Sequence, residues 1–108
     1  IKTDKYLLGR RLTAELETAS VQLARLDERQ ALYTDQLLPQ MAEQAEASLS
    51  AYNNDDGDFA EAVRARIAEL NTKIDALAIA VDRQKTIAQI NYLLAEASFD
   101  DARPAKPF

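Results

Sequence analysis

The sequence predicts an all-α fold, a long antiparallel two-helix coiled-coil hairpin that packs with further hairpins in a helical bundle or α-barrel. Two apolar stripes with heptad spacing, separated by one Gly-containing break, carry this prediction. Only two glycines in 108 residues, together with 29% charged residues, also favour long helices. We expect an antiparallel hairpin over 1–98, with a helix over about 4–53, a tip over 53–58, a helix over about 59–97 and a tail over 99–108.

The first helix has a candidate start and one interruption. Thr3 and Asp4 are suitable N-cap residues, because their side-chain oxygens accept hydrogen bonds from free backbone N–H groups. Pro39 removes a backbone donor and its ring clashes with the preceding turn. We therefore expect a kink or break near Gln36–Pro39.

The string Asn-Asn-Asp-Asp-Gly-Asp at 53–58 predicts the turn of the hairpin. Gly57 is expected to take a positive φ and so end the first helix, with Asn and Asp tolerating that conformation next best. Asp58 is a suitable N-cap for the second helix, and Glu61 three residues later completes a capping-box pattern. The tail contains Pro104 and Pro107.

The two stripes predict the contact between the helices. Residues paired across the break keep a constant sum of 111, as Tyr52 does with Phe59, so we expect the two stripes to face each other. On the first helix the stripe is Leu12, Leu16, Ala19, Leu23, Leu26, Gln30, Tyr33, Leu37, Met41, Ala45, Leu49 and Tyr52. On the second it is Phe59, Val63, Ile67, Leu70, Ile74, Leu77, Val81, Gln84, Ala88 and Asn91.

Two features of these faces leave alternatives open. The polar members Gln30, Gln84 and Asn91 either fix the register by pairing across the hairpin or line an aqueous surface. A second stripe on the later helix either widens the contact or meets further helices, since a two-helix hairpin alone buries little. That second stripe is Ala62, Ala65, Thr72, Ala76, Ile79, Ile87, Ile90 and Leu94.

Composition argues against several classes of function. A net charge of −5 without a basic block does not fit a nucleic-acid interface, so we expect no nucleic-acid partner. The chain has no Cys and no His, so thiolate metal sites and the commonest general base are missing. No apolar run approaches the ~20 residues that span a bilayer. Because the chain starts with Ile, we expect it to be a piece of a larger protein.

The acidic residues do not form a recognisable catalytic or metal site. If Gly57 were the glycine of a calcium loop, Tyr52 and Val63 would occupy ligand positions, which excludes an EF-hand. A weak surface cation site at the turn stays open, although turn formation explains the same residues. Asp pairs in a turn and a tail have no enclosing pocket to separate their pKa values. We therefore predict no enzyme activity and no cofactor.

Several short motifs at the break resemble one known family. In sequence order they are Leu32-Tyr33, Leu37-Leu38-Pro39-Gln40, Ala47-Ser48-Leu49, Ala51-Tyr52 and Gly57-Asp58-Phe59. Their order and spacing are similar to the second long periplasmic hairpin of TolC-like outer-membrane efflux proteins, closest to the metal-cation and multidrug efflux branch. The resemblance covers about residues 12–97, roughly a quarter of a typical family member. This chain departs from the family at Asp55, where a first tip glycine is usual, and at Glu61-Ala62-Val63, where the family often has a Leu-rich start.

The resemblance implies a function for the whole chain. Such proteins are trimers whose hairpins pack side by side into an α-barrel that crosses the periplasm and continues into the outer membrane. A periplasmic adaptor docks on the hairpin tips and connects the duct to an inner-membrane pump. The tip residues that would face the adaptor are Tyr52, Asn53, Asn54, Asp55, Asp56, Gly57, Asp58 and Phe59. The implied location is the periplasm of a Gram-negative bacterium, as part of an outer-membrane protein.

A second reading from another class stays open. The same heptads fit a stand-alone coiled-coil scaffold or interaction module that oligomerises into a helical bundle. An excised barrel segment should associate weakly or promiscuously, whereas a complete module should form one defined oligomer.

Overall fold

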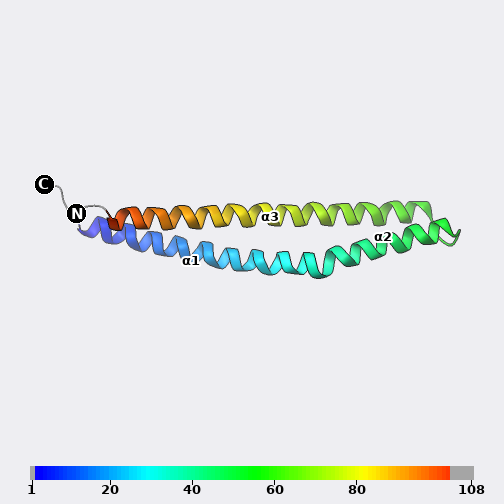
Figure 1. Ribbon diagram of the computed structural model, residues 1–108, viewed down its shortest axis with the longest axis horizontal. Helices are drawn as coiled ribbons and strands as arrows, with labels where there is room; N and C mark the ends of the chain where they lie inside the picture. The colour runs from blue at the N-terminus through cyan, green and yellow to red at the C-terminus, as the bar shows by residue number, and fades with distance from the viewer. Residues whose placement is uncertain (1, 103–108) are drawn as a thin grey trace. The chain divides into compact units, whose positions relative to one another are not determined.

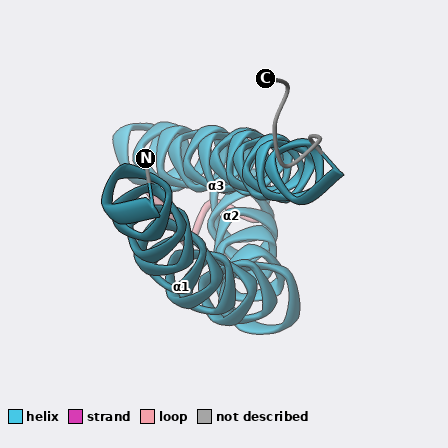
Figure 2. Cartoon of the chain, turned by 90° about the vertical axis from the view of Figure 1, so that its left-hand side faces the viewer, coloured by secondary structure: helices cyan, strands magenta, loops and turns pink. Residues whose placement is uncertain are grey.

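The computed structural model describes residues 2–102, which are helical apart from one turn (Figures 1 and 2). In chain order the elements are α1 (Lys2–Leu32), a π-helix η1 (Tyr33–Leu37), α2 (Leu38–Asn53) and α3 (Phe59–Ala102). None of the described residues is in a strand. The all-α prediction and the helical hairpin are thereby confirmed.

The chain divides into two compact units. The terminal unit combines Ile1–Arg25 with Arg83–Phe108, and the tip unit comprises Leu26–Asp82. In each unit an outgoing helical segment and a returning one run antiparallel (Figure 1). The buried residues of the terminal unit are Leu12, Ala19, Thr86 and Leu93; those of the tip unit are Leu26, Ala45, Ala65, Glu69 and Ile79.

The bounds of the outer helix ends differ from the sequence prediction. α1 already includes Thr3 and Asp4, so these residues lie in its first turn and are not its N-cap. α3 continues to Ala102, and the part of the predicted tail over 99–102 is helical. Nothing in this stretch breaks a helix before Pro104, and proline disfavours the helical conformation of the residue preceding it. Pro104, Pro107 and the rest of the predicted tail lie outside the described residues.

The expected interruption near Pro39 is a π-helix. The backbone N–H of Leu38 donates to the carbonyl oxygen of Tyr33, five residues earlier, and α2 then continues with Pro39 in its first turn. The wider turn holds one extra residue just before a proline that has no N–H to donate. In the apolar stripe of the first helix, Leu37, Met41 and Ala45 follow one another at spacings of four residues. All three are half-buried or buried. The extra residue is thus absorbed with the apolar face of the helix still turned inward.

The predicted contact face of the first helix is largely confirmed. Its members from Leu12 to Ala45 are buried or half-buried, whereas Leu49 and Tyr52 are exposed and Ser48 is half-buried instead.

The predicted contact face of α3 is wrong. All ten residues of the stripe from Phe59 to Asn91 are exposed, so the constant-sum pairing of Leu70 with Met41 or Ile74 with Leu37 does not describe the packing. The second stripe faces inward instead, with Ala65 and Ile79 buried and Leu94 alone exposed. Small Ala and Thr side chains let two helix backbones approach closely, which explains why the smaller stripe forms the contact. Gln84 and Asn91 are therefore on the aqueous surface.

Candidate functional site: the hairpin tip and the exposed face of α3

The end of α2 is a Schellman motif with an aspartate in the left-handed position. The N–H of Asp56 donates to the carbonyl of Ala51 at 2.8 Å, and the N–H of Asp55 donates to the carbonyl of Tyr52 at 3.1 Å. Asp55 has φ = 63°, the conformation that glycine adopts most easily at this position. The expectation that Gly57 supplies the positive φ is therefore wrong, because Asp55 does so two residues earlier.

Gly57 is needed for a different reason, which is space. A Cβ added to Gly57 would lie 2.9 Å from the Cβ of Ala51 and 3.0 Å from the backbone nitrogen of Tyr52. Contacts this short with backbone atoms are not relieved by rotating a side chain. The turn can fold back on the end of α2 only because residue 57 has no side chain.

Asp58 starts α3 as predicted. Its carboxylate oxygen Oδ1 accepts a hydrogen bond from the backbone N–H of Ala60 at 3.1 Å, and its carbonyl oxygen accepts from the N–H of Ala62 at 3.1 Å. The side chain thus satisfies one of the free donors in the first turn of the helix. The reciprocal bond from Glu61 that a capping box requires is not among the hydrogen bonds of the described residues.

An aromatic pair closes the turn. The ring centroids of Tyr52 and Phe59 lie 5.5 Å apart with the ring planes tilted by 58°. The distance between the ring centroids lies within the range of favourable aromatic pairs. Both residues remain exposed, Tyr52 at 41% and Phe59 at 62% of their surface.

All eight predicted tip residues share one end of the tip unit. Asn53 is the last residue of α2, 54–58 form the turn, and Phe59 is the first residue of α3. Each of the eight is exposed. The surface therefore combines two exposed aromatic rings with the carboxylates of Asp55, Asp56 and Asp58.

The structure adds an exposed apolar face that the sequence pattern assigned to the interior. We call it the α3 stripe; it has heptad spacing on one side of the helix and lies wholly within the tip unit. Its members and their exposed fractions are Phe59 62%, Val63 39%, Ile67 50%, Leu70 49%, Ile74 63%, Leu77 63% and Val81 45%. Single exposed apolar residues are normal on soluble proteins, but a continuous face of this length marks an interaction surface.

One carboxylate of α3, that of Glu69, is buried in the tip unit. Glu69 is 6% exposed, and its two carboxylate oxygens lie 3.0 Å from Nη1 of Arg66 and 3.5 Å from Nζ of Lys73. Both cations extend to solvent, since their side chains are more than half exposed. All three belong to the same helix at i,i+3 and i,i+4 spacing, so the cluster stabilises α3 itself.

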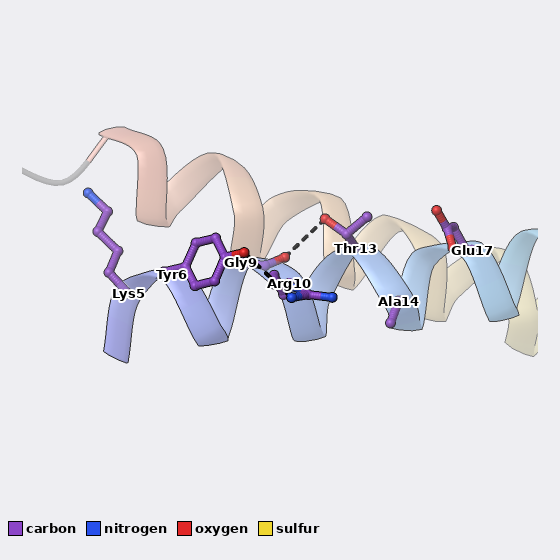
Figure 3. A pocket seen from close by; sticks show the side chains of 7 residues that line it. All are labelled: Lys5, Tyr6, Gly9, Arg10, Thr13, Ala14 and Glu17. Carbon is purple, nitrogen blue, oxygen red and sulfur yellow. Dashed lines mark hydrogen bonds between the residues drawn. The ribbon is translucent and has the colours of Figure 1, made fainter. Parts of the chain in front are cut away.

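A shallow depression on the surface of α1 carries no site. Arg10 lies 5.8 Å from the ring of Tyr6 and donates to its hydroxyl at 3.5 Å, and the Thr13 hydroxyl donates to the Gly9 carbonyl at 3.0 Å (Figure 3). These groups bond to each other along one exposed helix face and do not converge on a common point. Binding pockets differ in being concave, with a few polar groups directed at the ligand.

The described residues contain neither a metal-ligand cluster nor a helix suited to crossing a bilayer. Over residues 2–102 there is no group of three or more His, Cys, Asp or Glu side chains that could hold a metal ion. Within the same range, no helix combines the length and apolar character that a membrane crossing requires. Comparisons of the chain with protein families, with curated proteins and with solved structures gave no match.

Proposed function

We propose that the chain is a periplasmic α-helical segment of an outer-membrane efflux channel, the trimeric exit duct of a tripartite pump. Its tip, Tyr52 to Phe59, docks a periplasmic adaptor protein that links the duct to an inner-membrane pump. Neighbouring hairpins of the same trimer pack against its sides. The segment has no catalytic role in this proposal, because a duct requires a lining and a docking end.

The geometry of the turn is the observation that carries the proposal. The family motif residues at the break act together, since Gly57 leaves room for Ala51, Tyr52 contacts Phe59 and Asp58 caps α3. Asp55 stands where the family usually has a glycine, and its φ of 63° is the conformation that favours glycine. Asp55 therefore differs from the family motif in residue type, but it adopts the backbone conformation that a glycine would adopt at this position.

The exposed faces support the second part of the proposal, the lateral packing. None of the described side chains is fully buried, and the large apolar residues of α3 in the tip unit, with the exception of Ile79, are exposed. Burial of apolar surface is the main favourable term in folding and association, so the α3 stripe favours an assembly in which further helices cover it. The packed walls of an α-barrel would supply those helices.

Two experiments test the channel proposal. Sequencing the source gene on both sides of this segment should reveal a second long hairpin and strand-rich stretches. In the full-length product, Gly57→Leu should abolish co-purification of the adaptor while chemical cross-linking still yields a trimer. A start codon directly before Ile1 with a stop codon directly after Phe108 would contradict the proposal.

A stand-alone coiled-coil scaffold is the second candidate, and the α3 stripe also favours it. Two hairpins could cover each other's stripes in a four-helix bundle. Analytical ultracentrifugation of the 108-residue chain distinguishes the two functions. One defined oligomer over a wide concentration range supports the scaffold, and weak or polydisperse association supports an excised barrel segment.

A further inference from the structure

We propose that the α3 stripe binds the exposed side of α2 in a second copy of this chain, with the two hairpin tips level and pointing the same way. The contact joins two different faces of the tip unit, so each copy offers both halves of it. Such a contact repeats from copy to copy, either closing into a ring or continuing. The inference goes beyond the proposed function, because it follows from the side-chain sizes and charges of the tip unit alone.

The exposed side of α2 carries small side chains that suit the bulky residues of the α3 stripe. Within the hairpin, large residues of the first helix face small residues of α3, among them Ala65 and Thr72. Between two copies the sizes are reversed, since the stripe consists of Phe, Val, Ile and Leu, whereas Ala42 and Ala47 are exposed on α2. Leu49, 37% exposed, adds an apolar residue nearer the tip. Small residues on one helix let bulky residues of another pack between them while the backbones approach closely.

One edge of the α3 stripe is positively charged. Arg66 and Lys73 each lie three or four residues from stripe members on either side of them, so helical periodicity places both beside the stripe. The two cations share the single carboxylate of Glu69, and more than half of each cationic side chain stays exposed. The exposed acidic residues of α3 in the tip unit lie on the opposite side of the helix from this edge: Glu61, Asp75 and Asp82. A partner that places carboxylates along the edge is therefore favoured.

The exposed side of α2 carries only negative charge. Glu43 and Glu46 are exposed, and neither forms an ion pair with another residue in the described part of the chain. Glu46 follows Ala42 by four residues and precedes Leu49 by three, so a carboxylate and apolar side chains share one side of the helix. The sequence has no Lys or Arg over 30–63. This side of α2 therefore has the charge that the edge of the stripe lacks.

The opposite charges come to the same level when two copies lie with their tips together. Arg66 is the seventh residue after the start of α3, and Glu46 is the seventh before the end of α2. Both helices rise by about 1.5 Å per residue, so these two side chains lie equally far from the tip. By the same count Lys73 is level with Pro39, and the exposed Asp35 lies about one helical turn from that level.

Contact between two α3 stripes would not give these cations a carboxylate. In an antiparallel pair centred on Leu70, Arg66 of one copy would lie beside Lys73 of the other, because the same edges face each other. In a parallel pair the two cations would face Asn71 and Ala78, each five residues farther along the helix. The exposed side of α2 in a second copy is therefore the face whose charges complement the stripe.

Charge reversal in the full 108-residue chain tests the inference. Sedimentation velocity at concentrations up to about 1 mM should show that the unchanged chain associates. Arg66→Glu with Lys73→Glu should weaken this association about tenfold or more, and Glu43→Lys with Glu46→Lys should do the same. An equimolar mixture of the two variants should recover it, because each reversed face then meets its complement.

Three results of this experiment would overturn the inference. They are an unchanged chain that stays monomeric throughout, a Glu43→Lys with Glu46→Lys variant that associates as strongly as the unchanged chain, and a mixture that recovers nothing. Circular dichroism checks that both variants remain helical, since Arg66→Glu with Lys73→Glu also removes the ion pairs of Glu69.

Disulfide cross-linking is a second test that leaves every charge in place. The chain has no cysteine, so an introduced pair reports a single contact. Leu70→Cys mixed with a mass-tagged Ala42→Cys copy should give mixed dimers under mild oxidation, because the two positions are equally far from the tip. Ala68→Cys, exposed on another side of α3, is the matched control and should give few. Dimers of Leu70→Cys with itself as the main product, or equal cross-linking from Ala68→Cys, would overturn the inference. The gene-context and adaptor tests of the channel proposal do not depend on either result.

Discussion

The backbone of Gly57 lies against Ala51, so closely that a Cβ on residue 57 would be 2.9 Å from the Cβ of Ala51. The same added atom would lie 3.1 Å from the carbonyl carbon of Ala51. Gly57 has no positive φ, so steric space and not conformational freedom makes glycine necessary here. The contact fixes where the chain leaves α2, and with it the direction in which α3 begins.

We predict that Gly57→Ala lowers the free energy of unfolding by about 1–3 kcal/mol, the usual cost of forcing a methyl group into a packed site. The matched control is Gly9→Ala, because a Cβ at Gly9 has nothing within 4 Å. Because Gly9 lies inside α1, past its first turn, that exchange should raise the free energy of unfolding by roughly 0.5–1 kcal/mol. Urea unfolding followed by circular dichroism measures both; similar shifts for the two variants would contradict the role assigned to residue 57.

The left-handed conformation of Asp55 leads to a second prediction. Asp55→Gly should raise the free energy of unfolding by up to about 1 kcal/mol, because glycine reaches positive φ without the steric cost that other residues meet. Asp56→Gly is the control, since Asp56 has no positive φ and glycine there only adds freedom to the unfolded chain. Thermal unfolding midpoints should move in opposite directions for these two neighbours.

A third prediction concerns the π-helix before Pro39. Pro39→Ala should change the free energy of unfolding by less than about 1 kcal/mol, because the π-helix directly before the proline already widens the turn into which its ring and missing N–H fall. Ala42→Pro, three residues later in the interior of α2, should cost about 3 kcal/mol or more. Denaturant titration of the two variants measures the contrast; a large loss on removing Pro39 would argue against this account.

The tip unit shows most clearly which features of the fold can be predicted from the sequence alone. The heptad spacing predicted a helical hairpin, and the turn chemistry correctly placed the start of α3 at Phe59 with Asp58 as its cap. The eight tip residues lie at one end of the tip unit because they are close in sequence. Local rules of this kind depend on a few adjacent residues, so one chain is enough to apply them.

The choice of the inward face of α3 could not be made from the same pattern. Two stripes share the heptad period, and the larger side chains of Leu70, Ile74 and Leu77 favoured the wrong one. The close packing of Ala65 in the tip unit and the exposure of Leu70 follow from tertiary spacing, which periodicity does not encode.

The buried carboxylate of Glu69 leads to a fourth prediction. Glu69→Leu should leave the free energy of unfolding unchanged or raise it by about 1 kcal/mol, because an apolar side chain of similar size replaces a buried charge and both former partners reach solvent. Glu61→Leu is the control for helix propensity, as Glu61 is exposed in the same helix. Unfolding curves in low and high salt measure both, and a loss above 2 kcal/mol for Glu69→Leu alone would show that the ion pairs stabilise α3 by more than the burial of the carboxylate costs.

The last prediction concerns the two apolar faces of α3, of which the α3 stripe is exposed and the second stripe, with Ala65, faces inward. Ala65→Leu should lower the free energy of unfolding by about 1–3 kcal/mol, because Ala65 is 8% exposed and the seam around it has no room for an isobutyl group. Ala68→Leu, at an exposed position of the same helix, should cost under about 0.5 kcal/mol. Leu70→Gln should also cost under about 1 kcal/mol, since Leu70 is 49% exposed in the free chain. If the larger stripe were the true seam, Leu70→Gln would be the damaging change and Ala65→Leu the harmless one, so denaturant unfolding of the three variants decides between the two faces.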